Sequence, residues 1–169
     1  MSFFNIVAAT NEDTVVATYE PSKVRSDSYQ SEAELEKEFI RLLCEQGYTY
    51  LPLHTEDELI ANLRSQLEEL NHYRFSDTEW RQFFSDVIAN PNEHITEKTR
   101  KIQEDNVQVL HRDDGSSKNI TLIDKKNIHN NRLQVINQYE VKQADGARHD
   151  NRYDVTILVN GFPLVHVEL

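Results

Sequence analysis

The sequence has few of the residues that characterise secreted, fibrous or membrane proteins. It contains one cysteine, four glycines and four prolines among 169 residues. No apolar run approaches the ~20 residues that a membrane-spanning helix needs, and the first residues lack the basic and apolar regions of a secretory signal. The single cysteine, Cys44, cannot form an internal disulfide, which fits a reducing compartment. We therefore expect a folded cytoplasmic protein that does not contact a membrane.

The chain also lacks the positive charge of a protein that binds nucleic acid by itself. Its net charge is −11 at pH 7. Residues 1–97 carry 7 basic and 19 acidic groups, whereas residues 98–169 carry 11 basic and 10 acidic groups. The C-terminal half could therefore approach a phosphate backbone, and the N-terminal half would be repelled by it. If DNA is the substrate, most of the grip must come from further chain or from other subunits.

The hydrophobic pattern changes once, near residues 90–98, from helical to strand-like spacing. Residues 1–28 are mixed and polar, and we expect them to be irregular. Residues 29–97 predict three amphipathic helices. The first begins at Ser31 with a capping box to Glu34, the second runs from about Thr55 to Leu70, and the third has its N-cap at Ser76 or Asp77. Residues 98–169 predict strands at 106–111, 120–124, 133–141, 153–159 and 162–169. The sequence thus predicts a single α+β domain, in which N-terminal helices pack on a mixed, mainly antiparallel β-meander.

The last two predicted strands flank Asn160-Gly161, a strong hairpin signal. The odd-numbered positions are all apolar and are expected to face the core: Val155, Ile157, Val159, Val165, Val167 and Leu169. The even positions carry an acid near each outer end, Asp154 and Glu168. A plain two-residue loop would exchange these faces between the strands. We therefore predict a longer loop with Gly161 as a G1 bulge, which leaves the two acids facing the same way.

Two carboxylates side by side repel each other unless a cation neutralises them. Both stay ionised if they share a divalent metal. Oxygen ligands suit Mg²⁺, which commonly uses one or two carboxylates and keeps several waters. In phosphodiester hydrolysis such a metal orients and activates a water and stabilises the developing charge. The hairpin therefore predicts a Mg²⁺ site, in which Mn²⁺ can substitute.

The segment from Asn151 to Leu169 resembles the PD-(D/E)xK nuclease motif as found in the restriction (R, HsdR) subunits of Type I restriction enzymes. In that motif an Asp begins one strand, and Glu-x-Lys follows on the next. The chain supplies Asp154, Glu168 and the intervening Leu169, and the lysine would fall at position 170. Further stretches are similar to the same subunit, so the resemblance spans roughly residues 27–169. These stretches are Asp27–Glu32, Lys98–Ile102 and Leu122–Asn127.

The resemblance implies a PD-(D/E)xK nuclease-like fold, truncated at the last motif strand, that cleaves double-stranded DNA with Mg²⁺. By carry-over, Asp154 and Glu168 are metal ligands, the main-chain carbonyl of Leu169 is a further one, and Glu36 is a catalytic candidate on the first helix. Without the lysine we expect weak or no activity, since losing such an electrostatic stabiliser commonly costs ~10²–10³ in rate.

The resemblance also implies partners. In the family the domain is joined to the ATP-driven translocase that forms the remainder of the R subunit, and it works with methylation (M) and specificity (S) subunits. The sequence has no GxxxxGK[ST] loop, so ATP is expected only through motor domains that lie outside it.

Several candidate residues also have a plainer interpretation. Arg152, Lys125 and Lys126 are candidates for DNA contact, but the arginine could pair with a nearby acid and the lysines could occupy a solvated turn. Asp154 could be a strand-end acid in water, and Glu36 lies in a run of glutamates typical of a solvated helix face.

Two other functions remain open. One is a non-catalytic interaction module, whose acidic helical part docks onto other subunits. The other is a different PD-(D/E)xK enzyme, such as a repair or junction nuclease. His166 shares the face of the two acids, where a structural role is favoured over metal ligation. Metal binding that is lost on Asp154→Ala would separate a nuclease site from an interaction module.

Overall fold

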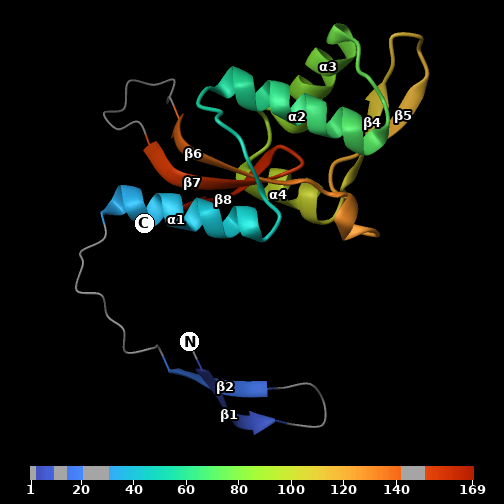
Figure 1. The fold of residues 1–169 in the computed structure, drawn as a ribbon. Helices are drawn as coiled ribbons and strands as arrows, with labels where there is room; N and C mark the ends of the chain where they lie inside the picture. Colours follow the sequence, from blue (N-terminus) through green and yellow to red (C-terminus); the bar gives the residue numbers. More distant parts are fainter. Residues whose placement is uncertain (1–2, 10–14, 21–30, 142–150) are drawn as a thin grey trace. The chain divides into compact units, whose positions relative to one another are not determined.

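The computed structural model describes residues 3–9, 15–20, 31–141 and 151–169 (Figure 1). They belong to two units, Met1–Ser31 and Glu32–Leu169. In the first unit, β1 (Phe3–Ala9) pairs antiparallel with β2 (Val15–Glu20). The prediction of an irregular segment over residues 1–28 is therefore wrong for these two strands. Both are rich in the β-branched and aromatic residues that favour strands, but their apolar residues do not alternate cleanly with polar ones.

The described part of the second unit contains four α-helices. The first two are α1 (Glu32–Glu45) and α2 (Glu56–Asn71), and the next two are α3 (Asp77–Phe83) and α4 (Ile95–Gln103). Capping boxes begin α2 at Thr55 and α3 at Ser76, because each side chain accepts from the backbone three residues on and a glutamate there returns the bond. A π-helical turn (Phe84–Ile88) continues α3. The three predicted helices are present, whereas α4 was not predicted and crosses the expected boundary at residue 97.

A mixed four-stranded sheet forms the centre of this unit. Its order is β3 (Thr49–Tyr50), β6 (Leu133–Val141), β7 (Asn151–Val159) and β8 (Phe162–Val167). β3 runs parallel to β6, and the other neighbours are antiparallel. The α+β class and the mixed, mainly antiparallel sheet agree with the sequence prediction.

The strands predicted over residues 98–169 do not form one continuous meander. Among the described strands, β4 (Val107–His111) and β5 (Ser117–Thr121) pair with each other alone and make a separate hairpin. Its buried residues pack on α2 and α3, in a cluster that contains Leu63, Leu67, Phe75, Trp80, Phe83, Leu110, Ile120, Leu122 and Phe162. This tertiary packing separates the hairpin from the main sheet. The first strand agrees with the predicted range 106–111, whereas the second lies at Ser117–Thr121 and not at the predicted range 120–124.

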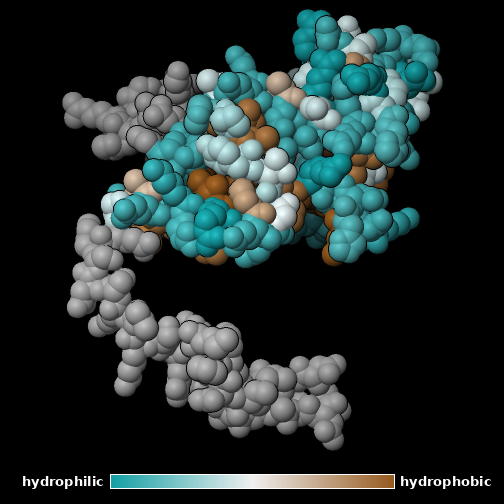
Figure 2. Space-filling view, in the orientation of Figure 1, coloured by the Kyte–Doolittle hydropathy of each residue, from teal (hydrophilic) through white to brown (hydrophobic). Residues whose placement is uncertain are grey.

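Helices α1 and α2 cover opposite faces of the four-stranded sheet (Figure 1). Leu43 of α1 packs with Val135 and Val155, whereas Leu59 of α2 packs with Ile136 and Leu158. Hydrophobic atoms reach the surface between the two helices, within a mainly hydrophilic face (Figure 2). Within the described part of the chain, none of the helices is long and apolar enough to cross a membrane.

The register of the β7–β8 hairpin differs from the prediction. Val159 pairs with Phe162, so Asn160-Gly161 is a two-residue turn, with φ of 50° and 84°. Positive φ at both positions is the mark of a type I′ turn, which Asn-Gly favours. The register then shifts, because Ile157 pairs with Val165 and Leu158 with Pro163. The predicted G1 bulge at Gly161 is therefore wrong, since the extra residue is Leu164.

Beyond this bulge the two strands regain the predicted phase, since Val155 pairs with Val167. The odd-numbered residues of these strands are nevertheless not all buried in the core. Val155 is fully buried, but Val165 is 46% exposed and Leu169 is 42% exposed. β8 is the edge strand of the sheet, so its outer residues lack a neighbouring strand that would cover them.

Candidate metal centre

Asp154 lies near the start of β7, next to the segment that follows β8. Val155 pairs with Val167 and Thr156 with His166, so the next position brings Glu168 level with Asp154. The backbone N–H of Leu169 donates a 2.9 Å hydrogen bond to Oδ2 of Asp154. The structure therefore brings the carboxylate of Asp154 against the backbone of Leu169, the residue that follows Glu168.

Glu36 is held against the same sheet by its helix. The apolar stripe of α1 packs Phe39, Ile40 and Leu43 around Val135 and Val155. This stripe follows the i, i+3, i+4, i+7 spacing of a helix that buries one face. Glu36 lies one turn before Phe39 and Ile40, so the same packing places it over β6.

The carboxylate of Glu36 has specific partners on that strand. Oε1 accepts a 2.5 Å hydrogen bond from Nδ2 of Asn137, and Oε2 accepts one from Nε2 of Gln138. Glu36 is partly buried, so it is not simply one charge of a solvated helix face. Neither amide was singled out from the sequence, where the only signal was two adjacent polar residues inside an apolar strand.

The three acids lie at one end of the sheet. Asn137 pairs with Val155 and Tyr139 with Tyr153, so Gln138 is level with Asp154. Glu36 is therefore anchored on β6, Asp154 lies on β7, and Glu168 follows β8. Within residues 31–141 and 151–169, no three Asp, Glu, His or Cys side chains converge closely enough to hold a metal ion. Strand pairing and contacts therefore place the three acids near one end of the sheet, but the three do not form a ligand cluster in this structure.

His166 contacts the side chains of two residues on β7. Its Nδ1 lies 2.9 Å from Oγ1 of Thr156, and its ring stacks on that of Tyr153 with a centroid distance of 4.0 Å. Partial burial lowers the pKa of His166, which favours the neutral imidazole. These contacts fit the structural role expected for this residue.

The three basic candidates for DNA contact do not form one cluster: Lys125 and Lys126 are neighbours in the loop after β5, whereas Arg152 lies in β7. Nζ of Lys125 donates to the carbonyl oxygens of Gln103 and Glu104, at 2.8 and 3.2 Å, and so caps the C-terminal end of α4. Lys126 is exposed in the loop that follows β5. Arg152 lies in β7 opposite Glu140, and its side chain lies outside the described part of the structure.

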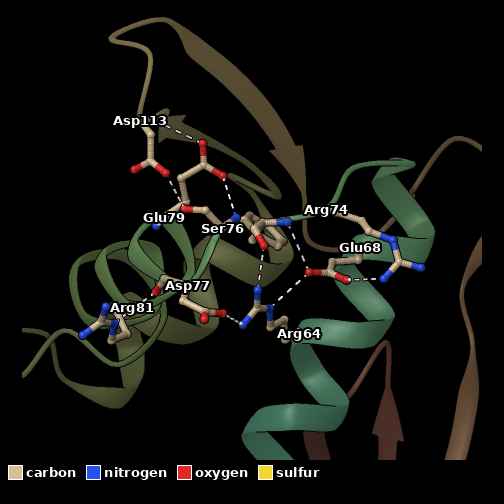
Figure 3. A network of polar contacts seen from close by, with 9 residues as sticks. Arg64, Glu68, Arg74, Ser76, Asp77, Glu79, Arg81 and Asp113 are labelled. Carbon is tan, nitrogen blue, oxygen red and sulfur yellow. Dashed lines mark hydrogen bonds and ion pairs between the residues drawn. The ribbon is translucent and has the colours of Figure 1, made fainter.

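A second polar cluster joins α2, α3 and the β4–β5 turn (Figure 3). Glu79 is only 5% exposed. It accepts hydrogen bonds from the backbone N–H groups of Ser76 and Asp113 and from the hydroxyl of Tyr73. Burial raises the pKa of Glu79, but these hydrogen bonds and Arg112 outweigh it and hold the pKa below its usual value. The bond from Ser76 caps α3, and the bond from Asp113 joins α3 to the β4–β5 turn, so this cluster has a structural role.

Part of this cluster could have been found from the sequence. The spacing of Ser76 and Glu79 predicts a capping box, but the contact with Asp113 joins residues 34 positions apart. Arg64 of α2 completes the cluster, since it donates to Asp77, to Glu68 and to the carbonyl of Phe75. Such long-range contacts leave no local pattern.

Residues 29–169 match the family described as Type I restriction enzyme R protein N terminus. The chain is 45% identical over 164 residues to the EcoprrI endonuclease subunit of a Type I restriction enzyme from Escherichia coli, and the match covers 96% of this chain. It is 34% identical over 146 residues to the SsaAORF53P endonuclease subunit from Staphylococcus saprophyticus, which covers 83% of this chain. It is 35% identical over 147 residues to the SauMSSORF170P endonuclease subunit from Staphylococcus aureus strain MSSA476, which covers 84%.

These matches define the class of protein: a subunit of a Type I restriction enzyme. More narrowly, the chain belongs to the family of R protein N-termini, as the sequence resemblance indicated. It spans 51% of the length of the Escherichia coli relative and 15% of each staphylococcal relative.

Proposed function

We propose that this chain is the N-terminal nuclease domain of a Type I restriction enzyme R subunit, with a PD-(D/E)xK nuclease-like fold that cleaves double-stranded DNA with Mg²⁺. The observation that carries the proposal is the hydrogen bond from Leu169 to Asp154. It joins Asp154, the first acid of the motif, to the backbone of the residue that follows Glu168, the second acid. Membership of the R protein family supports the same interpretation.

The residues at this end of the sheet suit a hard divalent cation. The available donors are the carboxylates of Asp154, Glu168 and Glu36 and the carbonyl of Leu169, all oxygens of the kind that Mg²⁺ prefers. The N–H of Leu169 occupies one of about four lone-pair sites on the Asp154 carboxylate, so the others are available for a cation. When bound, the cation would orient and activate a water and stabilise charge that develops on the phosphate.

The protein's own residues then hold the donors in place. The hydrogen bond from Leu169 fixes the rotation of the Asp154 carboxylate, and the two amides on β6 fix that of Glu36. Fixed donors matter because a metal ligand that must be ordered on binding loses affinity to conformational entropy. Lys126 and Arg152 remain candidates for phosphate contact, whereas Lys125 combines that possibility with its role at the end of α4.

The partners follow from the family and from the charge. Each relative is named as an endonuclease subunit of a Type I restriction enzyme, so we propose that this chain acts within a multi-subunit complex. Its net charge of −11 favours DNA binding that depends on other parts of that complex. We propose these parts to be the methylation and specificity subunits and the remainder of the R subunit, through which ATP would act.

Calorimetric titration with Mn²⁺ tests the proposed site. We expect the wild-type chain to bind Mn²⁺, and Asp154→Asn to weaken binding by at least about tenfold. Asp105→Asn is the matched control, since Asp105 is an exposed aspartate between α4 and β4, and it should leave the affinity unchanged. Equal, weak binding by all three proteins would contradict the proposal and favour a docking module without a metal.

A further inference from the structure

Strand β6 contains one residue with an unusual backbone. Gln138 has a φ of 56°, in the left-handed region that is unfavourable for a residue with a Cβ. Among the described residues, the other non-glycines with positive φ are His72, which caps the end of α2, and Asn160, in the β7–β8 turn. Both occupy positions where this conformation is common. Gln138 lies inside a strand, and such strain persists where the surroundings enforce it, often at a functional site.

The left-handed residue changes which side chains share a face. Ile136 and Tyr139 both pack with Leu59 on the α2 side, although they are three residues apart. In a regular strand, residues three apart point to opposite faces. The alternation of faces is therefore interrupted between Ile136 and Tyr139. The two residues there, Asn137 and Gln138, both donate hydrogen bonds to Glu36 of α1. The backbone of Gln138 therefore presents two consecutive amides to one carboxylate.

The two amides fix Glu36 firmly. Each carboxylate oxygen has its own donor, Asn137 for Oε1 and Gln138 for Oε2. The amide of Asn137 is itself oriented, because its Oδ1 accepts a 2.8 Å hydrogen bond from the hydroxyl of Tyr50. Oε1 of Gln138 is different: it is buried and has no hydrogen-bond partner among the described residues. A buried acceptor without a donor is costly, so this oxygen is suited to a donor that arrives with a ligand.

We propose that Gln138 is a positioning residue of the metal site. Its amide nitrogen holds Glu36 at the level of Asp154, and its unpartnered oxygen accepts a hydrogen bond from water that accompanies the cation. This inference rests on the proposed function, since it assigns Gln138 to the metal site at the end of the sheet. It also explains why an unfavourable backbone is kept inside a strand.

The variant Gln138→Gly tests the positioning role of Gln138 without adding backbone strain. Glycine adopts positive φ freely, so we expect Tm to be unchanged or raised while the amide is lost. Mn²⁺ affinity, measured by titration calorimetry, should fall ~10–100-fold, as for other residues that orient metal ligands. His72→Gly is the matched control, because it removes a side chain at a φ of 48° on another element. It should affect Tm in the same direction and leave Mn²⁺ affinity unchanged.

A double-mutant cycle tests whether Gln138 acts through Glu36. If it does, Glu36→Ala should already remove most of its effect, and Gln138→Gly should weaken Mn²⁺ binding no more than about twofold further in that background. Independent, additive losses would overturn the positioning role, because a residue that acts through Glu36 cannot add its full effect once Glu36 is absent.

The outcomes separate this inference from the proposed function. If Gln138→Gly keeps wild-type affinity while Asp154→Asn loses it, the inference is wrong and the proposed function stands. If neither variant loses affinity, both are wrong. If Gln138→Gly does not fold, Gln138→Asn decides, because asparagine tolerates positive φ and its shorter amide cannot reach Glu36. A folded Gln138→Asn protein that keeps its Mn²⁺ affinity would overturn the inference.

Discussion

Asp154 and Leu169 are joined by a 2.9 Å hydrogen bond from the backbone N–H of Leu169 to Oδ2 of Asp154. The bond lies at the open end of the β7–β8 hairpin, and the Asn160-Gly161 turn closes the other end. The phase of the two strands between these ends decides whether the two acids of the motif meet. The proposed site therefore depends on the turn and on the bulge at Leu164 as much as on the acids.

Gly161 is fixed by its close contact with α2, so replacing it should be costly. A Cβ on Gly161 would lie 2.6 Å from Cα of Leu63, and its φ is 84°. We expect Gly161→Ala to destabilise the protein by about 2–4 kcal/mol, from steric overlap and left-handed strain together. Urea unfolding measures the loss. Gly115→Ala is the control, with a φ of 80° and open space around it, and should cost only about 1 kcal/mol. Equal losses would contradict the close contact.

Asn160 contributes more than its backbone conformation. Its side chain is 1% exposed, donates to the carbonyl of Leu122 and to Oδ1 of Asn131, and accepts from the N–H of Arg132. Asn160→Gly keeps positive φ but removes these bonds, so we expect a loss of about 2–3 kcal/mol in urea unfolding. If the turn needed only positive φ, the variant would stay within about 0.5 kcal/mol of the wild type.

Because of Glu79, the stability of the protein should depend on pH in the acid range. Burial raises its pKa, but hydrogen bonds from Ser76, Tyr73 and Asp113 hold the pKa below the usual 4.5. A carboxyl group with a lowered pKa stabilises the fold above its unfolded pKa, and the contribution is lost as pH falls through the folded pKa. We expect Glu79→Gln to cost about 2–3 kcal/mol at neutral pH.

The difference between wild type and Glu79→Gln should shrink below about pH 4.5, because only the wild type loses the ionised carboxylate there. Urea midpoints across the acid range measure this change. A difference that stays constant down to the lowest pH at which both proteins fold would show that the ionisation of Glu79 contributes nothing to stability.

Val155 and Val165 should respond differently to the same substitution. Val155 is fully buried, whereas Val165 is 46% exposed on the edge strand. Val155→Thr places a hydroxyl in the core and should cost about 1–3 kcal/mol, but Val165→Thr should stay within about 0.5 kcal/mol of the wild type. Thermal or urea unfolding checks both. Similar losses would mean that the outer face of β8 is covered in solution.

The sequence predicted the elements better than their pairing. Helices α1, α2 and α3 were all predicted, and in the structure capping boxes at Thr55 and Ser76 begin two of them. The separate β4–β5 hairpin depends on packing against α2 and α3, which no local pattern encodes. The bulge at Leu164 was anticipated only as a need for one extra residue, because alternation fixes the phase of two strands but not the place where it is adjusted.

The candidate site, too, was predictable only where it depends on local patterns in the sequence. Alternation and the resemblance pointed to Asp154 and Glu168, and the structure brings the segment of the second acid to the first. Glu36 lay within a run of glutamates, and only its contacts with β6 distinguish it from its neighbours. Gln138 could not be found from the sequence, because a left-handed residue inside a strand has no local signature when it is not glycine.

The most direct test of the central claim is anomalous diffraction from crystals of this chain soaked in Mn²⁺. If the proposed site binds the metal, we expect one Mn²⁺ peak about 2–2.5 Å from a carboxylate oxygen of Asp154, with the carbonyl of Leu169 as a further ligand and Glu36 on the same side. A saturating soak that gives no peak beside Asp154, or a peak only among the exposed glutamates of α1, would contradict it.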